Sequence, residues 1–218
     1  MGSIRSRGGN VKVIYRLSDG EVKVLEEEEL CRTPVIRVIN RTVQYEQFDG
    51  TMSNVQKWNV VERTGGSAVL IYNKDTDMLL LVEQVRPAVL SPSMIGFEVD
   101  YPKNCRMLEL LAGGFGKDSP VDCARREAME EAGVDPLILE YVSEFFLSPG
   151  ISNERIHLFY AEIDNSRIID TGGGLVEEDE NIKCHWMTPE LVEIMVMSGD
   201  IVDAKTMIGV LWFMRYKR

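Results

Sequence analysis

The chain has 218 residues, 44 % of them hydrophobic and 27 % charged, which suits one soluble domain or one domain with a small extension. Its net charge of −11 repels nucleic-acid phosphates, and no apolar run reaches the ~18 residues of a membrane helix, so neither nucleic acid nor a membrane is an expected partner. Residues 1–10 lack the apolar core of a secretory signal, so the expected location is cytoplasmic.

The first 60 residues are predicted to form β structure and make up the first of two expected domains. Strands are expected at 11–17, 21–25, 34–40 and 42–48. The β region is broken by Asp19-Gly20 and Asp49-Gly50, which are hairpin signals. The acidic run from Glu26 to Glu29 is interpreted as a solvated turn or helix face.

Residues 61–218 are expected to form the second domain, in which strands and helices are mixed. Helices are predicted at 120–132, 189–198 and 204–216, and residues 91–103 are predicted to be a surface loop. The order of elements indicates the α/β class, with a central sheet and helices packed on it. The strands of that sheet are expected at 66–73, 78–85, 106–112, 139–147, 156–163 and 182–187.

The cysteines and histidines do not suggest a metal centre. The four cysteines are far apart and form no C-x-x-C pair, which argues against a thiolate zinc site and against a disulfide framework. His157 and His185 are too few for a histidine metal cluster. Both are interpreted as ordinary strand residues.

The helix at 120–132 has clear ends and an acidic face. Ser119 suits the N-cap and Gly133 the position after the last turn. Glu127 and Glu131 are four residues apart, so they share a face with Cβ atoms ~5–6 Å apart. Arg126 can pair with Glu130 but is expected to leave these two acids without a partner. Hard cations such as Mg²⁺ prefer oxygen ligands of this kind, whereas the alternative is a solvent-facing acidic surface.

Residues 126–134, R-E-A-M-E-E-A-G-V, resemble the second half of the Nudix box, G-x5-E-x7-R-E-U-x-E-E-x-G-U, where U is a bulky apolar residue. The first half departs from the pattern. Counting back from Arg126, the usual glutamate falls on Asp118 and the usual glycine on Ala112. Alternatively, Ala112-Gly113 matches the Ala-Gly pair of the family and the loop is one residue shorter. The second alignment is favoured because Gly tolerates a close approach of the backbone to a metal.

The resemblance implies a Nudix fold, a mixed β-sheet sandwiched by helices, with a small N-terminal β-sheet extension. It implies Mg²⁺ as cofactor, with Mn²⁺ as a possible substitute. Glu127, Glu131 and the main chain near Ala112 would hold the metal. Arg126 would orient the helix acids, which include Glu130 at the edge of the same face.

Two segments resemble substrate-binding parts of one subgroup. Gln84-Val85-Arg86-Pro87 looks like the Q-x-R-x segment of nucleotide-sugar pyrophosphatases, in which the arginine touches the diphosphate. Residues 148–154, S-P-G-I-S-N-E, resemble the S-P-G-x-x-x-E loop of ADP-ribose pyrophosphatases. The implied substrate-binding residues are Arg86, Ser148, Pro149, Gly150 and Glu154.

Two further segments are similar to the same subgroup. Residues 171–180 resemble a mobile loop that supplies the last carboxylates, which implies Glu178, or a nearby acid, as general base and Glu180 as an additional metal ligand. Residues 199–206, G-D-I-V-D-A-K-T, resemble the G-x-I-x-D-x-K-T end of enzymes acting on GDP-mannose or UDP-glucose.

The expected function is hydrolysis of the diphosphate bond of a nucleoside diphosphate sugar, with ADP-ribose giving AMP and ribose 5-phosphate as the leading candidate. UDP-glucose and GDP-mannose are alternative substrates, and a non-catalytic nucleotide-sugar-binding module is the alternative of another class. In the subgroup the N-terminal sheet swaps across a homodimer and lines the site. A homodimer is therefore expected, with Trp58 and Tyr45 as candidates to stack on the base.

Overall fold

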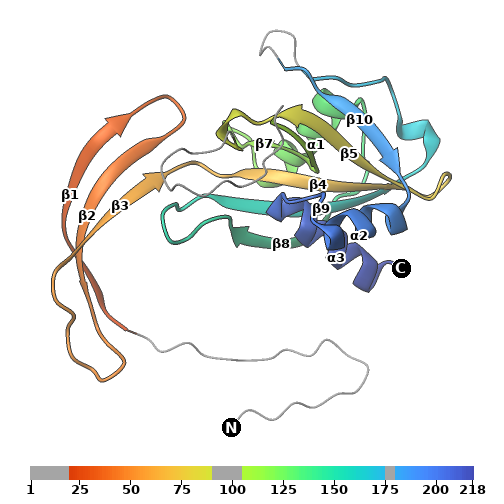
Figure 1. The fold of residues 1–218 in the computed structure, drawn as a ribbon. Coiled ribbons are helices and arrows are strands. Elements are labelled where there is room, and N and C mark those ends of the chain that lie inside the picture. Colours follow the sequence, from red (N-terminus) through yellow and green to blue (C-terminus); the bar gives the residue numbers. More distant parts are fainter. Residues whose placement is uncertain (1–19, 90–104, 175–179) are drawn as a thin grey trace. The chain divides into compact units, whose positions relative to one another are not determined.

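The computed structural model describes residues 20–89, 105–174 and 180–218 of the chain. It divides into two compact units, Met1–Val61 and Glu62–Arg218 (Figure 1). The strand predicted at 11–17, the loop predicted at 91–103 and the proposed base Glu178 lie outside the described residues.

The first unit contains a three-stranded sheet in the order β1-β2-β3. Its strands are β1 (Val22–Arg32), β2 (Arg37–Tyr45) and β3 (Gln56–Glu62), and β1 runs antiparallel to β2. Ile39 and Val43 of β2 are its buried hydrophobic residues within the described range. Gly50, with φ of 83°, lies in the turn between β2 and β3, as the Asp-Gly signal predicts.

Several predictions for this unit are wrong in detail. Glu26 to Glu29 lie within β1 and not in a turn or helix, because the strand is stabilised by charges on its neighbour. Glu27 pairs with Arg41 at 2.6 Å and Glu29 with Arg37 at 2.9 Å, both across the β1–β2 ladder. The two strands expected at 34–40 and 42–48 are one strand, β2, and β3 was not predicted.

The second unit is built on a seven-stranded mixed sheet. The order of the main path is β10-β5-β4-β9-β8, with β6 paired to β5 and β7 paired to β4. Strands β4 and β9 are parallel and the other described ladders are antiparallel. The bounds are β4 (Gly66–Asn73), β5 (Met78–Val85), β6 (Arg106–Glu109), β7 (Leu111–Gly114), β8 (Glu140–Phe146), β9 (Arg155–Ile163) and β10 (Lys183–Met187).

The single strand expected at 106–112 is divided in two at Leu110. This residue is fully buried, and its N–H donates to Thr206 Oγ1 at 2.8 Å instead of to a neighbouring strand. The break arises from a residue 96 positions away, so no local sequence signal could predict it.

Helices cover both faces of this sheet, as Figure 1 shows. Alternate residues of a strand point to opposite faces, so Val69 and Ile71 of β4 pack with α1 (Pro120–Ala132). Leu70 packs instead with α2 (Pro189–Ser198) and α3 (Ala204–Tyr216). The predicted α/β class, with a mixed sheet between helices, is confirmed.

The three long helices begin and end at the predicted residues, because their end signals are local. The Ser119 side chain accepts a hydrogen bond from the Asp122 N–H, and Gly133 is left-handed with φ of 61°. Thr188 and Asp203 cap α2 and α3 in the same way as Ser119. The described residues also include two short 3-10 helices, Pro87–Val89 and Asn165–Arg167.

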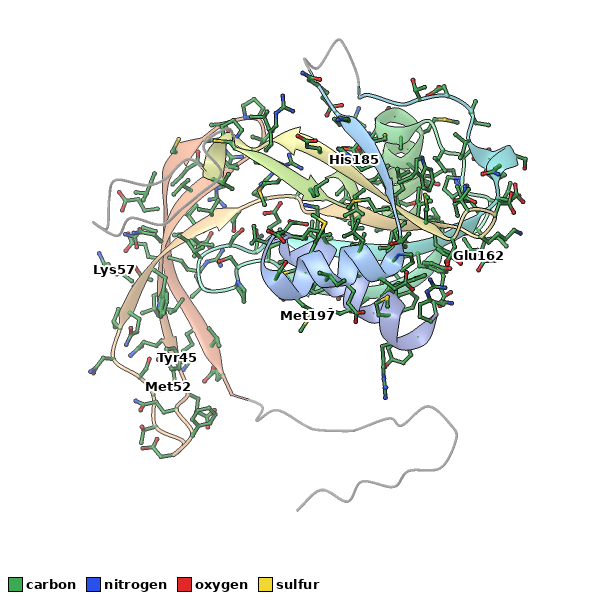
Figure 2. The ribbon with its side chains drawn as sticks, turned by 45° about the vertical axis from the view of Figure 1, so that its right-hand side comes forward. Tyr45, Met52, Lys57, Glu162, His185 and Met197 are labelled. Atoms are coloured by element: carbon green, nitrogen blue, oxygen red, sulfur yellow. The ribbon has the colours of Figure 1, made fainter. Side chains whose placement is uncertain are left out.

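Both histidines are strand residues, as predicted. His157 lies in β9, and His185 lies in β10, where its Nε2 is 2.9 Å from Glu83 of β5 (Figure 2). The described cysteines are all free thiols. No helix in the described ranges is both long and apolar enough to cross a bilayer.

Candidate active site

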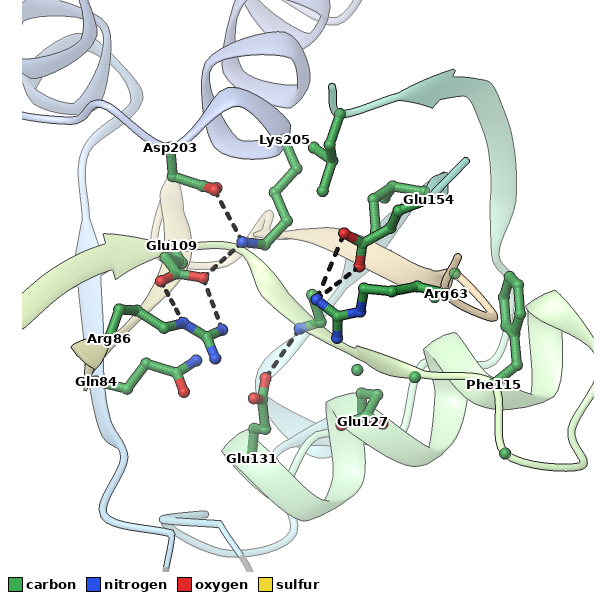
Figure 3. A pocket seen from close by; sticks show the side chains of 18 of the residues that line it. Arg63, Gln84, Arg86, Glu109, Phe115, Glu127, Glu131, Glu154, Asp203 and Lys205 are labelled. Carbon is green, nitrogen blue, oxygen red and sulfur yellow. Dashed lines mark hydrogen bonds and ion pairs between the residues drawn. The ribbon is translucent and has the colours of Figure 1, made fainter. Parts of the chain in front are cut away.

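A cavity of about 930 Å³ lies in the second unit (Figure 3). Its wall comes from β4, the ends of β5 and β6, β7, the first residues of β9, α1 and the start of α3. Acidic and basic side chains gather around it. They include Arg86, Glu109, Glu127, Glu131, Glu180 and Lys205.

The α1 face directs two buried carboxylates into this cavity. Glu127 and Glu131 are 8 % and 2 % exposed. Glu131 accepts a hydrogen bond from the Ala112 N–H at 3.0 Å, shown in Figure 3. A side chain at Gly113 would overlap the Glu127 carboxylate, so glycine lets β7 pack directly on Glu127 without displacing it. Ala112, Glu127 and Glu131 are thus brought together as the sequence predicts.

These carboxylates are held where a negative charge is unfavourable. Burial raises the pKa of Glu131 to about 8, and the nearby charge of Glu127 adds to this. Burial also raises the pKa of Glu127, against the opposing effect of Arg126. Two desolvated acids side by side favour either a shared proton or a bound cation.

Arg126 forms ion pairs with three acidic side chains that line the cavity. Its Nη1 lies 2.7 Å from Glu130 and 2.8 Å from Glu127, and its Nε lies 2.8 Å from Asp118. The bond to Asp118, above all, raises the pKa of Arg126. The prediction that Glu127 lacks a partner is wrong, because one guanidinium nitrogen of Arg126 lies close to both Glu127 and Glu130.

Glu180 lines the same cavity, and its charge contributes to the raised pKa values of Glu127 and Glu131. Among the described residues, no three acidic, histidine or cysteine side chains form a ready-made metal cluster. A divalent ion would instead draw on the two helix acids, Glu180 and main-chain oxygens near Ala112, with water completing the shell. An all-oxygen donor set with several waters fits Mg²⁺.

A second charged group on the cavity wall centres on Glu109, which is 2 % exposed. Arg86 donates to it through Nε at 2.7 Å and Nη2 at 2.8 Å. Lys205 Nζ lies 2.5 Å from the same carboxylate and 2.9 Å from Asp203. Burial raises the pKa of Glu109, but the bonds with Arg86 and Lys205 outweigh it and the net shift is downward.

Sequence reasoning identified Arg86 but missed Glu109 and Lys205 as site residues. A charged residue inside an otherwise apolar strand, and a lysine in the first turn of an apolar helix, were the available signals. Neither signal says which partner such a residue meets.

Of the residues predicted to bind substrate in the β8–β9 loop, some line the cavity and others do not. Ser148, Pro149 and Gly150 are exposed in the turn and are absent from the described lining of the cavity. Glu154 lines the cavity and pairs with Arg63 at 3.2 Å, another residue that sequence reasoning missed. Phe115 also lines the cavity, with its ring edge-on to His157 at 5.5 Å between centroids.

Known proteins resemble this chain closely. It is 35 % identical to a GDP-mannose pyrophosphatase of Cronobacter sakazakii over 169 residues, which cover 78 % of this chain and 83 % of the relative. It is 32 % identical to a GDP-mannose pyrophosphatase of Citrobacter koseri over 152 residues, 70 % of this chain and 74 % of the relative. An ADP-ribose pyrophosphatase of Haemophilus influenzae is 30 % identical over 200 residues, 91 % of this chain and 88 % of the relative.

The family comparison agrees with the geometry. The model of the NUDIX domain matches residues 62–207. This stretch contains every residue described as lining the cavity, from Arg63 to Lys205. The chain belongs to the Nudix hydrolase family.

Proposed function

We propose that this protein hydrolyses the diphosphate bond of a nucleoside diphosphate sugar with Mg²⁺ as cofactor, and that ADP-ribose is the preferred substrate. The observation that carries the proposal is the placing of buried Glu127 and Glu131 in the same cavity as Arg86. Acids of this kind suit a divalent cation, and a planar guanidinium suits a diphosphate. The H. influenzae relative, matched along 91 % of this chain, is named an ADP-ribose pyrophosphatase.

In the proposed reaction, Glu127, Glu131, Glu180 and the main chain near Ala112 hold the cation. Mn²⁺ would be a substitute for Mg²⁺. When bound, the cation lowers the pKa of a water and neutralises charge on the phosphates. Glu178, or a nearby acid, takes the proton of the attacking water. The water attacks one phosphorus, and the products are a nucleoside monophosphate and a sugar phosphate.

Arginines position the substrate and the helix acids in this proposal. Arg86 stabilises the charge that develops on the diphosphate. Arg126 keeps Glu127 and Glu130 in place through its ion pairs. Glu154 contributes to substrate binding from the cavity wall. Ser148, Pro149 and Gly150 would contribute from the exposed turn beside the cavity lining and not from the lining itself.

Base recognition and assembly are proposed from the first unit. Tyr45 and Trp58 are 38 % and 48 % exposed as whole residues, and aromatic side chains of this kind could stack on a base. The protein would act as a homodimer in the cytoplasm. It would take a small nucleotide-sugar substrate, with no nucleic-acid or membrane partner.

The test is a panel of ADP-ribose, GDP-mannose and UDP-glucose with Mg²⁺, followed by chromatography of the products. We expect the highest kcat/KM with ADP-ribose, giving AMP and ribose 5-phosphate. Glu131→Gln removes a proposed cation ligand and is expected to lower kcat about 100-fold or more. Glu190→Gln, on the exposed surface of α2, is the matched control and should keep wild-type turnover.

Near wild-type turnover by Glu131→Gln would show the cation assignment to be wrong. Binding of the three nucleotide sugars without any product would favour the non-catalytic binding module. A higher kcat/KM for GDP-mannose or UDP-glucose would replace ADP-ribose as the substrate and leave the reaction class intact.

A further inference from the structure

The group around Glu109 balances its own charges. Two carboxylates, Glu109 and Asp203, face two cations, Arg86 and Lys205, within 2.5–2.9 Å contacts. Removing one partner of such a buried set leaves an uncompensated charge, which is strongly destabilising. Because this group of four side chains is electrically neutral, Glu109 can stay ionised at 2 % exposure and keep its hydrogen bonds to Arg86.

The Glu109 carboxylate accepts hydrogen bonds from one edge of the Arg86 guanidinium. The bonds use Nε and Nη2, so the fork is held by two parallel contacts that fix its plane. In the described part of the chain Nη1 forms no hydrogen bond. Arg86 keeps 39 % side-chain exposure and lines the cavity, as Figure 3 shows, so its outer edge remains available to an anion.

A second donor lies beside it. Gln84 lies near the end of β5 and precedes Arg86, the first residue after the strand, by two positions. Both line the cavity, and Gln84 Nε2 is buried without a hydrogen-bond partner among the described residues. An unsatisfied buried donor is destabilising, and an oxygen-rich ligand that accepts from it would remove that cost.

The start of α3 anchors this group to the sheet. Asp203 caps the helix by accepting from the Thr206 N–H at 3.0 Å. Thr206 Oγ1 donates to Asp203 and accepts from the Leu110 N–H, which directly follows Glu109. The Asp203, Lys205 and Thr206 positions of the G-x-I-x-D-x-K-T segment therefore all act on the strand end that carries Glu109.

We propose that Glu109, supported by Lys205, is a positioning residue for Arg86. It fixes the orientation of the guanidinium, so that the free edge can bind a diphosphate. The proposal rests on the proposed function for the choice of ligand. Glu109 itself is not expected to touch substrate, because its two oxygens are occupied by Arg86 and Lys205.

The experiment is a double-mutant cycle on the full chain, read by calorimetric binding of inorganic diphosphate with Mg²⁺. Glu109→Gln keeps the shape and removes the charge. We expect it to weaken diphosphate binding about 10- to 100-fold, the usual range for a supporting residue. In the Arg86→Ala background the same change should weaken binding by less than about 2-fold, because there is no arginine left to position.

Glu109→Asp provides a second variant, which preserves the charge balance of the group. Its shorter side chain cannot make both bonds to Arg86, so we expect affinity between those of wild type and Glu109→Gln. Glu140→Gln, which breaks the surface pair with Lys217, is the matched control and should bind diphosphate as wild type does. Mg²⁺ binding without diphosphate is measured for every variant, so that a loss of cation binding is separated from a loss of diphosphate binding.

Equal losses from Glu109→Gln with and without Arg86 would overturn the positioning role, as would wild-type affinity in Glu109→Asp and Glu109→Gln. Absence of diphosphate binding by the wild type would overturn it as well. If no nucleotide sugar is hydrolysed but the cycle is non-additive, the proposed function fails while the role of Glu109 stands.

Discussion

At the scale of single residues, the site separates into a local part and a distant part. Glu127 and Glu131 are four residues apart, as are Arg126 and Glu130, so helical spacing alone brings each pair together. Glu109 meets Arg86 across 23 positions and Lys205 across 96. The first group could be predicted from the sequence, whereas the second depends on the fold that brings β6 to the start of α3.

The raised pKa of Glu131 makes stability depend on pH when no divalent ion is present. The folded chain keeps a proton on Glu131 up to pH about 8, whereas the unfolded chain releases it near the ordinary value of 4.5. The stabilising contribution is therefore fully present below pH 4.5 and is lost as pH rises through about 8.

Thermal unfolding with a chelator between pH 5 and pH 9 measures this effect. We expect the Tm of the wild type to fall relative to that of Glu131→Gln as the pH rises, since the variant has no proton to lose. Added Mg²⁺ at pH 8 should raise the Tm of the wild type more than that of the variant. Parallel pH profiles for the two proteins would contradict the assignment.

At the scale of elements, those with local end signals were predicted well. The capping residues Ser119 and Gly133 define α1, and the strands 66–73 and 78–85 were predicted at their observed bounds. β1 was predicted too short because its acidic run looks like a surface loop until the arginines of β2 lie opposite. Pairing between strands was the missing information.

The contact between β7 and α1 gives a sharp test at this scale. Gly113→Ala would place a methyl group inside the space of the Glu127 carboxylate, so that the carboxylate or the strand must move. A displacement of ~1 Å at a reacting centre can cost 10²-fold in rate, and we expect a loss in kcat of that order. Steady-state kinetics with ADP-ribose and Mg²⁺ would measure it.

Gly114→Ala is the matched control, because its added Cβ would meet no atom closer than the Gly65 carbonyl oxygen at 3.9 Å. This variant should lose far less activity. Equal kinetics for the two alanine variants would show that the packing of β7 on Glu127 does not matter.

At the scale of the whole molecule, the first unit has little core of its own. Ile39 and Val43 are its buried hydrophobic side chains in the described range, while Val22, Val24 and Leu30 are at least half exposed. Sheets of this size need an additional packed surface for stability. The homodimer expected from the sequence would supply one, although nothing within a single chain could specify its geometry.

Light scattering of the purified protein at micromolar concentration tests this expectation. A homodimer should scatter with about twice the chain mass of 24.7 kDa. A Trp58→Ala variant removes an exposed aromatic side chain of β3 and should leave the catalytic acids unaltered. A wild-type mass equal to that of one chain would rule out the dimer under those conditions.

The hydrogen bond from Leu110 to Thr206 links the β6–β7 segment to the last helix of the second unit and has a consequence for shortened chains. A fragment that stopped before Asp203 would still carry the entire Nudix box, with both acids of α1. It would nevertheless lose the lysine that neutralises Glu109 and the hydroxyl that satisfies a buried amide. An intact Nudix box in a truncated protein is therefore poor evidence that the protein can still bind a diphosphate.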